Sequence, residues 1–397
     1  MPNPIAIGFS QADDPQEAAY QACVTAKNQL QGAPVHMVIV FTSIHYAKKE
    51  VLEAIHTVLK PAKLVGCSSA GLIVSNGIFS RGVIIIAITS PALHFGVGAA
   101  SYNAGKDSRQ LGFELAHSCN LDYKSTCVRQ ASIILYDGLL PYDNQFVLGQ
   151  QEIIGHSCPI IGGFSCDDFK FKKTHQFYQK QIFSNSAVGF FIGSSDCVVA
   201  FSNKHGFTPL GKPRMITAAE GPIIHTIDRK PAVAIYEEFF KGEVQNFKKN
   251  FLNSPGILYP LGIYLEDQRQ YLIRYPVDIL SDGSIVCQAD VPKNTEVHLT
   301  INNKDSCKQA ANAAALEIKE ALGGRPAQLI IIFESMVRHK ILGRHLFSEV
   351  QTIKEILGHS TPVAGMYSFG ELCHLNLNES NVNTHLQNAS LLLLAIG

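Results

Sequence analysis

The stretch LVGCSSAG, residues 64–71, decides the fold, because two further stretches of the chain repeat its pattern. In each copy an apolar strand end meets a glycine, and a serine follows that glycine three positions later. The other two copies are IIGGFSCD, residues 160–167, and VAGMYSFG, residues 363–370. The shared glycines and serines are Gly66, Gly162, Gly365, Ser69, Ser165 and Ser368. Self-similarity of this kind marks repeated supersecondary structure, so three copies of one structural unit are expected.

The sequence around each motif repeats as well. Between a preceding apolar run and the motif, apolar residues recur at helical spacing, as Val51, Ile55 and Val58 do in the first copy. The preceding runs lie at residues 35–41, 132–136 and 329–333, and closing apolar strands follow at 83–89, 187–192 and 391–396. Strand, helix and strand joined by short connections predict right-handed crossovers and mixed sheets covered by helices. The predicted fold class is therefore α/β, or α+β where antiparallel closing strands join the sheets.

An alanine-rich helix precedes each copy, and an aspartate stands at each expected helix start. These residues are Asp14, Asp107 and Asp305. A side-chain carboxylate at the N-cap accepts hydrogen bonds from the first-turn amides, so all three are predicted to be helix caps rather than functional acids.

The repeats and the length of the chain predict two domains. A chain of 397 residues is too long for one ordinary core. Residues 196–290 belong to no copy and are rich in Gly, Pro and short strand-like runs, which fits the core of a second domain. The predicted domains are residues 1–195 and 196–397.

Composition excludes several classes of protein. Hydrophobic residues make up 46% and charged residues 17% of the chain, as in a globular protein. Lys plus Arg and Asp plus Glu both number 33, so no net field attracts a nucleic acid. Residues 1–14 show no secretory signal. The nearest candidate for a membrane span is residues 82–100, but Pro91 interrupts it and its β-branched residues predict a strand. A cytoplasmic protein without a membrane partner is expected.

The cysteines and histidines predict neither a metal site nor a disulfide framework. The ten cysteines include no C-x-x-C pair, and no secretory signal accompanies them, so reduced thiols are expected. His339 and His345 are six residues apart and His374 and His385 eleven, so neither pair has the i, i+4 spacing of helical metal ligands. The glycine turns also lack the G-x-G-x-x-G and Walker patterns, so no nucleotide cofactor is expected.

Several strings in this order resemble the FIST domain family, named for F-box and intracellular signal transduction proteins. The strings resembling its N-terminal part are GCSSAG at 66–71, GG at 162–163 and DD at 167–168. Residues 217–236 resemble the segment that joins its halves. The strings resembling its C-terminal part are YPLG at 259–262, Arg274, DGS at 282–284 and GMYSFGE at 365–371. The resemblance covers nearly the whole chain, and the order and spacing of the strings carry it.

Two departures from the family pattern limit what is carried over. Ser335, Val337 and Arg338 stand where the family usually shows a cysteine and a glycine before an arginine. The closing His-Asn-Gln-Thr pattern appears here as HLQN, residues 385–388. No role of that cysteine or threonine is carried over to this chain.

The resemblance implies a stand-alone sensory module for small ligands such as amino acids, because the chain shows neither a kinase core nor an F-box. Two other classes stay open. A protein-recruitment scaffold is the alternative that the F-box association implies. A hydrolase would need Cys67 or Ser68 as nucleophile and a histidine brought close by the fold, but no G-x-S-x-G elbow is present. A non-enzymatic protein is expected.

A ligand site is predicted at the motif strand ends. Glycine at a strand end exposes backbone amides, and such ends line the ligand crevice of open α/β sheets. The shared glycines are equally explained by tight turns or close packing. An arginine can bind a carboxylate through two hydrogen bonds, and a nearby acid suits an amino group. The predicted ligand-binding residues are Ser68, Ser69, Asp168, Arg274, Arg338, Tyr367 and Glu371.

Overall fold

A computed structural model describes residues 4–103, 106–240, 244, 258–265, 270–374 and 384–397. In it the three motif copies form three equivalent strands, β3 (Lys63–Ser69), β9 (Ile160–Ser165) and β23 (Val363–Ser368). Each pairs in parallel with the apolar strand before it, namely β2 (Met37–Ser43), β8 (Arg129–Asp137) and β22 (Leu329–Ser335). The register is the same in all three pairs, because the shared serine lies opposite the last residue of its neighbour. The predicted repeat is confirmed.

The shared glycine has a packing explanation. A Cβ atom added at Gly66 would stand 2.0 Å from the carbonyl oxygen of Val40 on the neighbouring strand. The corresponding distances are 1.9 Å at Gly162 and 2.4 Å at Gly365. No side chain can be accommodated at such a distance without moving the backbone, so the glycine permits the close approach of two buried strands.

The three units share one plan of strand, helix, strand, helical segment, motif strand, hairpin and closing strand, and unit 3 has an additional helix before its motif strand. Unit 1 contains β1 (Ile5–Ser10), α1 (Pro15–Gln29), β2, η1 (Ile44–Tyr46), α2 (Lys49–Val58), β3, β4 (Leu72–Val74), β5 (Gly77–Phe79) and β6 (Val83–Ile88). Unit 2 contains β7 (His94–Ser101), α3 (Ser108–Asp122), β8, α4 (Gln145–Ile154), β9, β10 (Gln176–Tyr178), β11 (Gln181–Phe183) and β12 (Ser186–Gly193). Unit 3 contains β13 (Val199–Lys204), α7 (Lys304–Ala321), β22, α8 (Met336–Leu342), η4 (Gly343–His345), α9 (Phe347–Leu357), β23, β24 (Glu371–His374), β25 (Thr384–Gln387) and β26 (Leu391–Ile396).

The units exchange hairpins in a ring. The strand orders are β1-β6-β2-β3-β10-β11, β7-β12-β8-β9-β24-β25 and β13-β26-β22-β23-β4-β5. The hairpin that follows each motif therefore extends the sheet of another unit: unit 2 extends unit 1, unit 3 extends unit 2, and unit 1 extends unit 3. No unit forms its six-stranded sheet alone.

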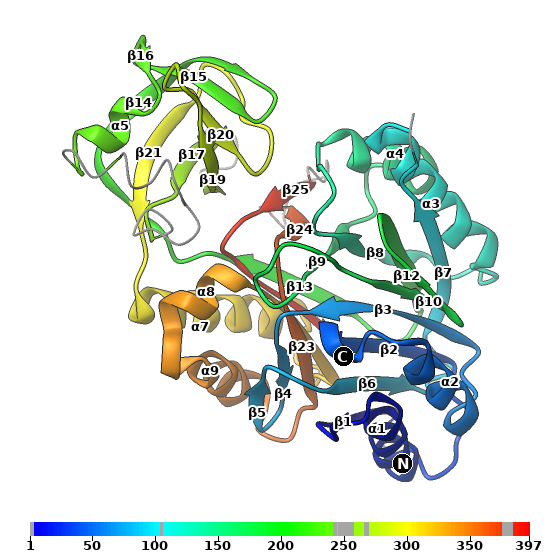
Figure 1. Ribbon diagram of the computed structural model, residues 1–397. Helices are drawn as coiled ribbons and strands as arrows, with labels where there is room; N and C mark the ends of the chain where they lie inside the picture. The colour runs from blue at the N-terminus through cyan, green and yellow to red at the C-terminus, as the bar shows by residue number, and fades with distance from the viewer. Residues whose placement is uncertain (1–3, 104–105, 241–243, 245–257, 266–269, 375–383) are drawn as a thin grey trace.

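The inner faces of the three sheets share one core. Phe41 of unit 1 and Phe333 of unit 3 meet edge to face, with ring centroids 6.1 Å apart, and Leu135 of unit 2 belongs to the same cluster. The alternate residues Val38 and Val40 face outward and pack with the alanines of α1. Helices thus lie on the outside of the three-sheet body (Figure 1). Burial on both faces explains why strands such as β6, VIIIAI, are continuously apolar.

A fourth sheet is inserted in unit 3 between β13 and α7, and it forms the lobe at the upper left of Figure 1. It has its own core, which includes Ile216, Ile263 and Ile285. Its strands are β14 (Thr208–Glu220), β15 (Ile223–Ile227), β16 (Lys230–Pro231), β17 (Leu261–Leu265), β18 (Gln270–Arg274), β19 (Pro276–Ile279), β20 (Ile285–Cys287) and β21 (Glu296–Ile301), and it carries helix α5 (Ala234–Glu237).

Two of the three predicted helix caps are present. Asp14 accepts a hydrogen bond from the Glu17 amide, and Asp107 accepts one from the Gln110 amide. The third prediction, Asp305, is wrong. Asn303 caps α7 instead, and Asp305 lies in the first turn, where a negative charge is favoured by the helix dipole.

The division of the chain into domains 1–195 and 196–397 stays a prediction. The sheets themselves pair across that position, because β24 binds β9 and β4 binds β23.

Candidate functional site

The motif ends of the three units meet at one junction, and Ser68 and Ser69 help to hold it together. Ser69 Oγ donates to the carbonyl oxygens of Gly71, at 2.6 Å, and Tyr367, at 3.0 Å. Ser68 Oγ donates to the Cys166 carbonyl at 3.1 Å and accepts from the His175 backbone amide at 3.0 Å. Both side chains are buried, so their hydroxyls join units 1, 2 and 3.

The thiols at this junction are in an apolar setting. Cys67 is fully buried, and its Sγ lies 3.3 Å from Met366 Sδ. Burial raises the pKa of the Cys67 thiol well above its ordinary value. Burial likewise raises the pKa of Cys166, whose Sγ donates to the Tyr367 carbonyl at 2.8 Å. A high pKa opposes thiolate formation, so these thiols lack the activation that a nucleophilic cysteine requires.

Glu371 is a buried acid beside the third motif. Its Oε1 accepts from Ser368 Oγ at 2.5 Å, and its Oε2 accepts from Ser390 Oγ at 2.8 Å. Burial raises the pKa of Glu371 to about 8, although the two serine hydrogen bonds act in the opposite direction. At neutral pH this carboxyl is therefore mainly protonated.

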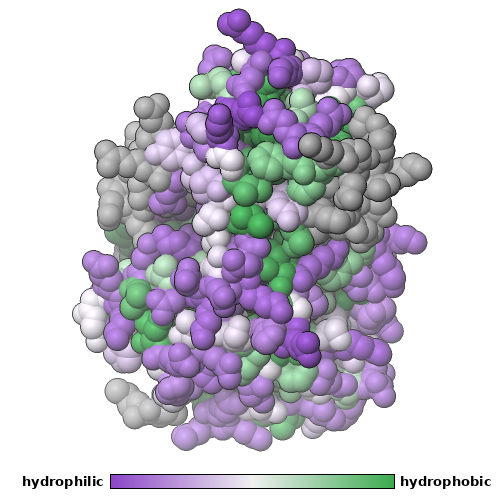
Figure 2. All heavy atoms as spheres, turned by 90° about the vertical axis from the view of Figure 1, so that its left-hand side faces the viewer, coloured by the Kyte–Doolittle hydropathy of each residue, from purple (hydrophilic) through white to green (hydrophobic). Residues whose placement is uncertain are grey.

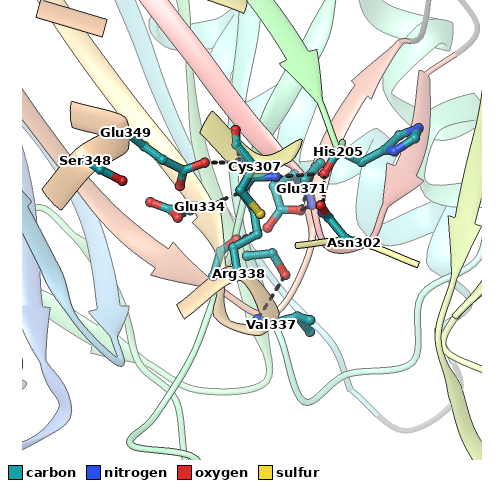
Figure 3. A network of polar contacts seen from close by, with 12 residues as sticks. His205, Asn302, Cys307, Glu334, Val337, Arg338, Ser348, Glu349 and Glu371 are labelled. Carbon is teal, nitrogen blue, oxygen red and sulfur yellow. Dashed lines mark hydrogen bonds and ion pairs between the residues drawn. The ribbon is translucent and has the colours of Figure 1, made fainter. Parts of the chain in front are cut away.

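Arg338 lies in a polar network between β22 and helices α7 to α9 (Figure 3). It forms an ion pair with Glu349, and its Nε lies 3.8 Å from Glu334 Oε1. Its guanidinium also donates to the carbonyls of His205 and Cys307. Burial alone would lower the pKa of Arg338, but the nearby acids, Glu349 first, outweigh it and raise that pKa.

The same region holds polar atoms without hydrogen-bond partners. They are Glu334 Oε1, Arg338 Nε, Glu349 Oε2 and Tyr367 OH, all buried; none forms a well-aligned hydrogen bond within the described residues, although Arg338 Nε and Glu334 Oε1 form the ion pair at 3.8 Å. Burial and then the neighbouring Glu349 raise the pKa of Glu334, which therefore favours its protonated form.

Arg274 ends β18 and bonds to backbone rather than to acids. Its Nε donates to the Asp290 carbonyl at 2.9 Å, and its Nη1 donates to the carbonyls of Ile273 and Leu386. It is 1% exposed, and burial lowers its pKa to about 10.

Asp168 is the one predicted site residue that is substantially exposed. Its carboxylate lies 2.7 Å from Lys170 Nζ and 3.7 Å from His45 Nε2. The hydrogen bond from Lys170 is the main cause that lowers the pKa of Asp168.

A cavity of about 210 Å³ opens where units 2 and 3 meet the inserted sheet. It lies at the carboxyl ends of β22 and β23, the edge at which open α/β sheets place their ligands. Its lining residues are Gly138, Phe169, Phe171, Tyr275, Val277, Gln288, Ser335, Met336, Val337, Lys340, Ser368 and Phe369. We call it the aromatic cavity. Phe171 and Phe369 stack within it, with ring centroids 4.6 Å apart.

A few polar side chains accompany these apolar walls. Ser335 caps α8, and Gln288 Nε2 donates to the Phe369 carbonyl at 2.8 Å. Lys340 Nζ lies 5.2 Å from the Phe169 ring centroid, and burial lowers the pKa of this lysine. Figure 2 shows apolar surface running down the middle of the face seen from the left of Figure 1.

None of the seven predicted ligand-binding residues lines the aromatic cavity, but several lie directly behind it. Glu371 bonds to Ser368 in its wall. Tyr367 packs against His339, which in turn contacts Phe169. That these residues touch a ligand stays a prediction. Sequence reasoning missed the aromatic walls, although Phe369 lies within the third motif and Phe169 lies two residues after the second.

The described residues contain neither a membrane-spanning helix nor a metal-ligand cluster. No helix in that part of the chain is long and apolar enough to cross a bilayer. No cluster of three or more His, Cys, Asp or Glu residues suited to a metal ion occurs there either.

Comparison with protein families gives two matches that together span most of the chain. The FIST N domain model matches residues 36–230, and the FIST C domain model matches residues 232–374.

Relatives with this sequence pattern are uncharacterised proteins. One from Methanocaldococcus jannaschii is 22% identical over 269 residues, covering 61% of this chain, which spans only 49% of that relative's length. One from Mycobacterium tuberculosis is 22% identical over 393 residues, covering 93% of this chain and 94% of its own.

Among solved structures, a cyanuric acid hydrolase from A. caulinodans aligns with 99% of this chain and 98% of its own, at 9% identity and a TM-score of 0.39. Another cyanuric acid hydrolase covers 51% of this chain and 71% of its own, at 11% identity and a TM-score of 0.30. Neither likeness is close enough to carry an argument about function.

Proposed function

The chain belongs to the FIST family, and on that premise we propose that it is a sensory module of intracellular signal transduction whose small ligand occupies the aromatic cavity. The observation that carries the proposal is the cavity itself. It is concave, lies at strand ends between separate parts of the fold, and combines apolar walls with few polar groups, as ligand sites commonly do.

The walls favour an amphipathic ligand. Phe169, Phe171 and Phe369 offer ring surfaces to an apolar body, while Lys340 offers a cation to an acidic end. An amino acid with an apolar side chain, or a similar small acid, meets these requirements. Two of the seven residues predicted from the sequence enter this proposal as supports behind the wall, Glu371 through Ser368 and Tyr367 through His339. A cytoplasmic location is part of the proposal.

A recruitment scaffold is the second candidate, because Phe171 and Val277 at the cavity are 45% and 42% exposed. A partner protein that inserts an apolar side chain would use the same surface. A hydrolase is not proposed, since Cys67 and Ser68 are buried and neither bonds to a histidine ring within the described residues.

A thermal-shift screen of metabolites, followed by variants at the cavity, tests the sensor. Val277→Glu places a charge on the apolar wall and should abolish the shift produced by any hit. Val128→Glu is the matched control, because Val128 is 81% exposed and does not line the cavity. If no metabolite shifts the parent protein and one partner protein co-purifies stoichiometrically, the sensor is refuted in favour of the scaffold.

A further inference from the structure

Two arginines among the described residues are completely buried, and their charges are compensated differently. Arg338 is 0% exposed and Arg274 is 1% exposed. A buried charge is costly unless it is paired, so each guanidinium needs compensation. Arg338 has this within the fold, from Glu349 at its Nη2 and from Glu334 further off.

Arg274 has no acid within 4 Å in the described part of the chain. Its Nε and Nη1 donate to three backbone carbonyls, whereas its Nη2 has no acceptor among those residues. Carbonyl dipoles compensate a full charge only partly, because they carry partial charges. Burial accordingly lowers the pKa of Arg274 to about 10, the opposite direction from Arg338.

Arg274 also lines a second cavity, of about 350 Å³. Residues of unit 2, the inserted sheet and β25 together enclose it. Among its lining residues are Asn144, Arg274, Asp290, Pro292 and His385. The two cavities have no lining residue in common.

One acid shares this second cavity. The Asp290 carboxyl accepts a hydrogen bond from the Asn144 backbone, and its Oδ1 lies beside Gly221 at the exposed edge. Burial, followed by repulsion from Asp143, raises the pKa of Asp290, whereas the nearby Arg274 acts in the opposite direction.

We propose that the second cavity is an anion site, in which Arg274 binds the carboxylate or phosphate group of a small ligand. The incoming oxygen would supply the acceptor that Nη2 lacks and the negative charge that the surrounding carbonyls do not provide. This site is separate from the aromatic cavity and does not depend on the proposed sensory function.

Isothermal titration of the full chain with sodium acetate and with inorganic phosphate tests the proposal, with ionic strength held constant by sodium chloride. One saturable site per chain is expected for at least one probe. Acetate binding would point to a carboxylate ligand, and binding of phosphate alone would point to a phosphate ester.

Three variants locate the site. Arg274→Gln should abolish binding, and Asp290→Asn, which removes the repelling charge, should strengthen it. Pro292→Glu adds a charge at an exposed position and leaves Arg274 intact. It should weaken binding on the order of three-fold to five-fold, as expected for one unit charge ~10 Å away at an effective dielectric near ~40. Pro292→Gln is its neutral control.

The proposal is overturned if neither probe binds saturably, or if Pro292→Glu binds as tightly as Pro292→Gln. The Pro292 pair decides the question even if Arg274→Gln does not fold. Failure of the anion-site proposal does not affect the proposed sensory function, because Val277→Glu tests the aromatic cavity alone.

Discussion

Replacing Glu371 by glutamine should make the stability of the protein less sensitive to alkaline pH. The folded state raises the pKa of this carboxyl from 4.5 to about 8, mainly by burial. The folded protein therefore keeps a proton that the unfolded chain releases. The stability linked to this proton is fully present below pH 4.5 and is lost as the pH rises through about 8.

The size of the effect follows from the two pKa values. A shift of this extent corresponds to roughly 5 kcal/mol over the whole range, of which about 2–3 kcal/mol is lost between pH 6 and pH 9. The substituted side chain would carry no titrating proton and would still offer a carbonyl acceptor and an amide donor to Ser368 and Ser390. The difference in unfolding free energy between variant and parent should thus move by about 2–3 kcal/mol in the variant's favour from pH 6 to pH 9.

Urea denaturation of both proteins at intervals between pH 6 and pH 9 measures this difference. Glu50→Gln, at an exposed position on α2, is the control and should show a constant difference from the parent. A constant difference for Glu371→Gln as well would show that this carboxyl does not titrate in the range, and the assignment of a buried protonated acid would be wrong.

Two further substitutions test the architecture. Arg338→Met leaves Glu349 and Glu334 buried without their cation and should lower the unfolding free energy by roughly 3–5 kcal/mol. Adding Glu349→Gln to this variant should restore part of the lost stability. If Arg338→Met is as stable as the parent protein, the ion-pair network does not stabilise the fold. Gly66→Ala forces a Cβ to within 2.0 Å of the Val40 carbonyl and should cost about 3 kcal/mol or more. Gly155→Ala, whose Cβ meets nothing within 4 Å, should cost less, about 1–3 kcal/mol, because only its backbone conformation (φ 76°, ψ 174°) disfavours a side chain. Denaturant titration measures both, and similar losses at the two glycines would refute the close-packing argument.

The repeated units were predictable because the same constraint recurs three times. Wherever β3, β9 or β23 approaches its parallel neighbour, only glycine fits, and the residue type is therefore visible in the sequence. The apolar runs were equally visible, because strands buried on both faces leave no polar positions.

The exchange of hairpins was not predictable from the sequence. Strands such as β4 and β10 contain only three residues, too few to show a period or to indicate a partner. Their partners are fixed by the ring of three sheets, which forms only when all units are present.

The partners of the candidate site residues were likewise not predictable from the sequence. Arg338 and Glu371 were predicted from the sequence as ligand-binding residues, and this stays a prediction, but the sequence contains no record of their partners inside the fold. Glu349, eleven residues from Arg338, and Ser390, nineteen from Glu371, satisfy them inside the fold. The walls of the aromatic cavity come from loops and from the inserted sheet, where no periodic pattern marks a residue as facing a cavity.

The ring of exchanged hairpins also bears on how the chain can be made. During synthesis, the sheet of unit 1 stays incomplete until β10 and β11 leave the ribosome, and the sheet of unit 2 waits for β24 and β25 near the carboxyl end. The sheet of unit 3 forms last, when β23 pairs with β4, which lies almost three hundred residues earlier in the chain. Contacts of such long sequence separation slow folding and leave strand edges open in the meantime. The nascent chain can therefore complete its folding only late in synthesis. A truncated chain exposes unpaired strand edges, which favour association with other chains.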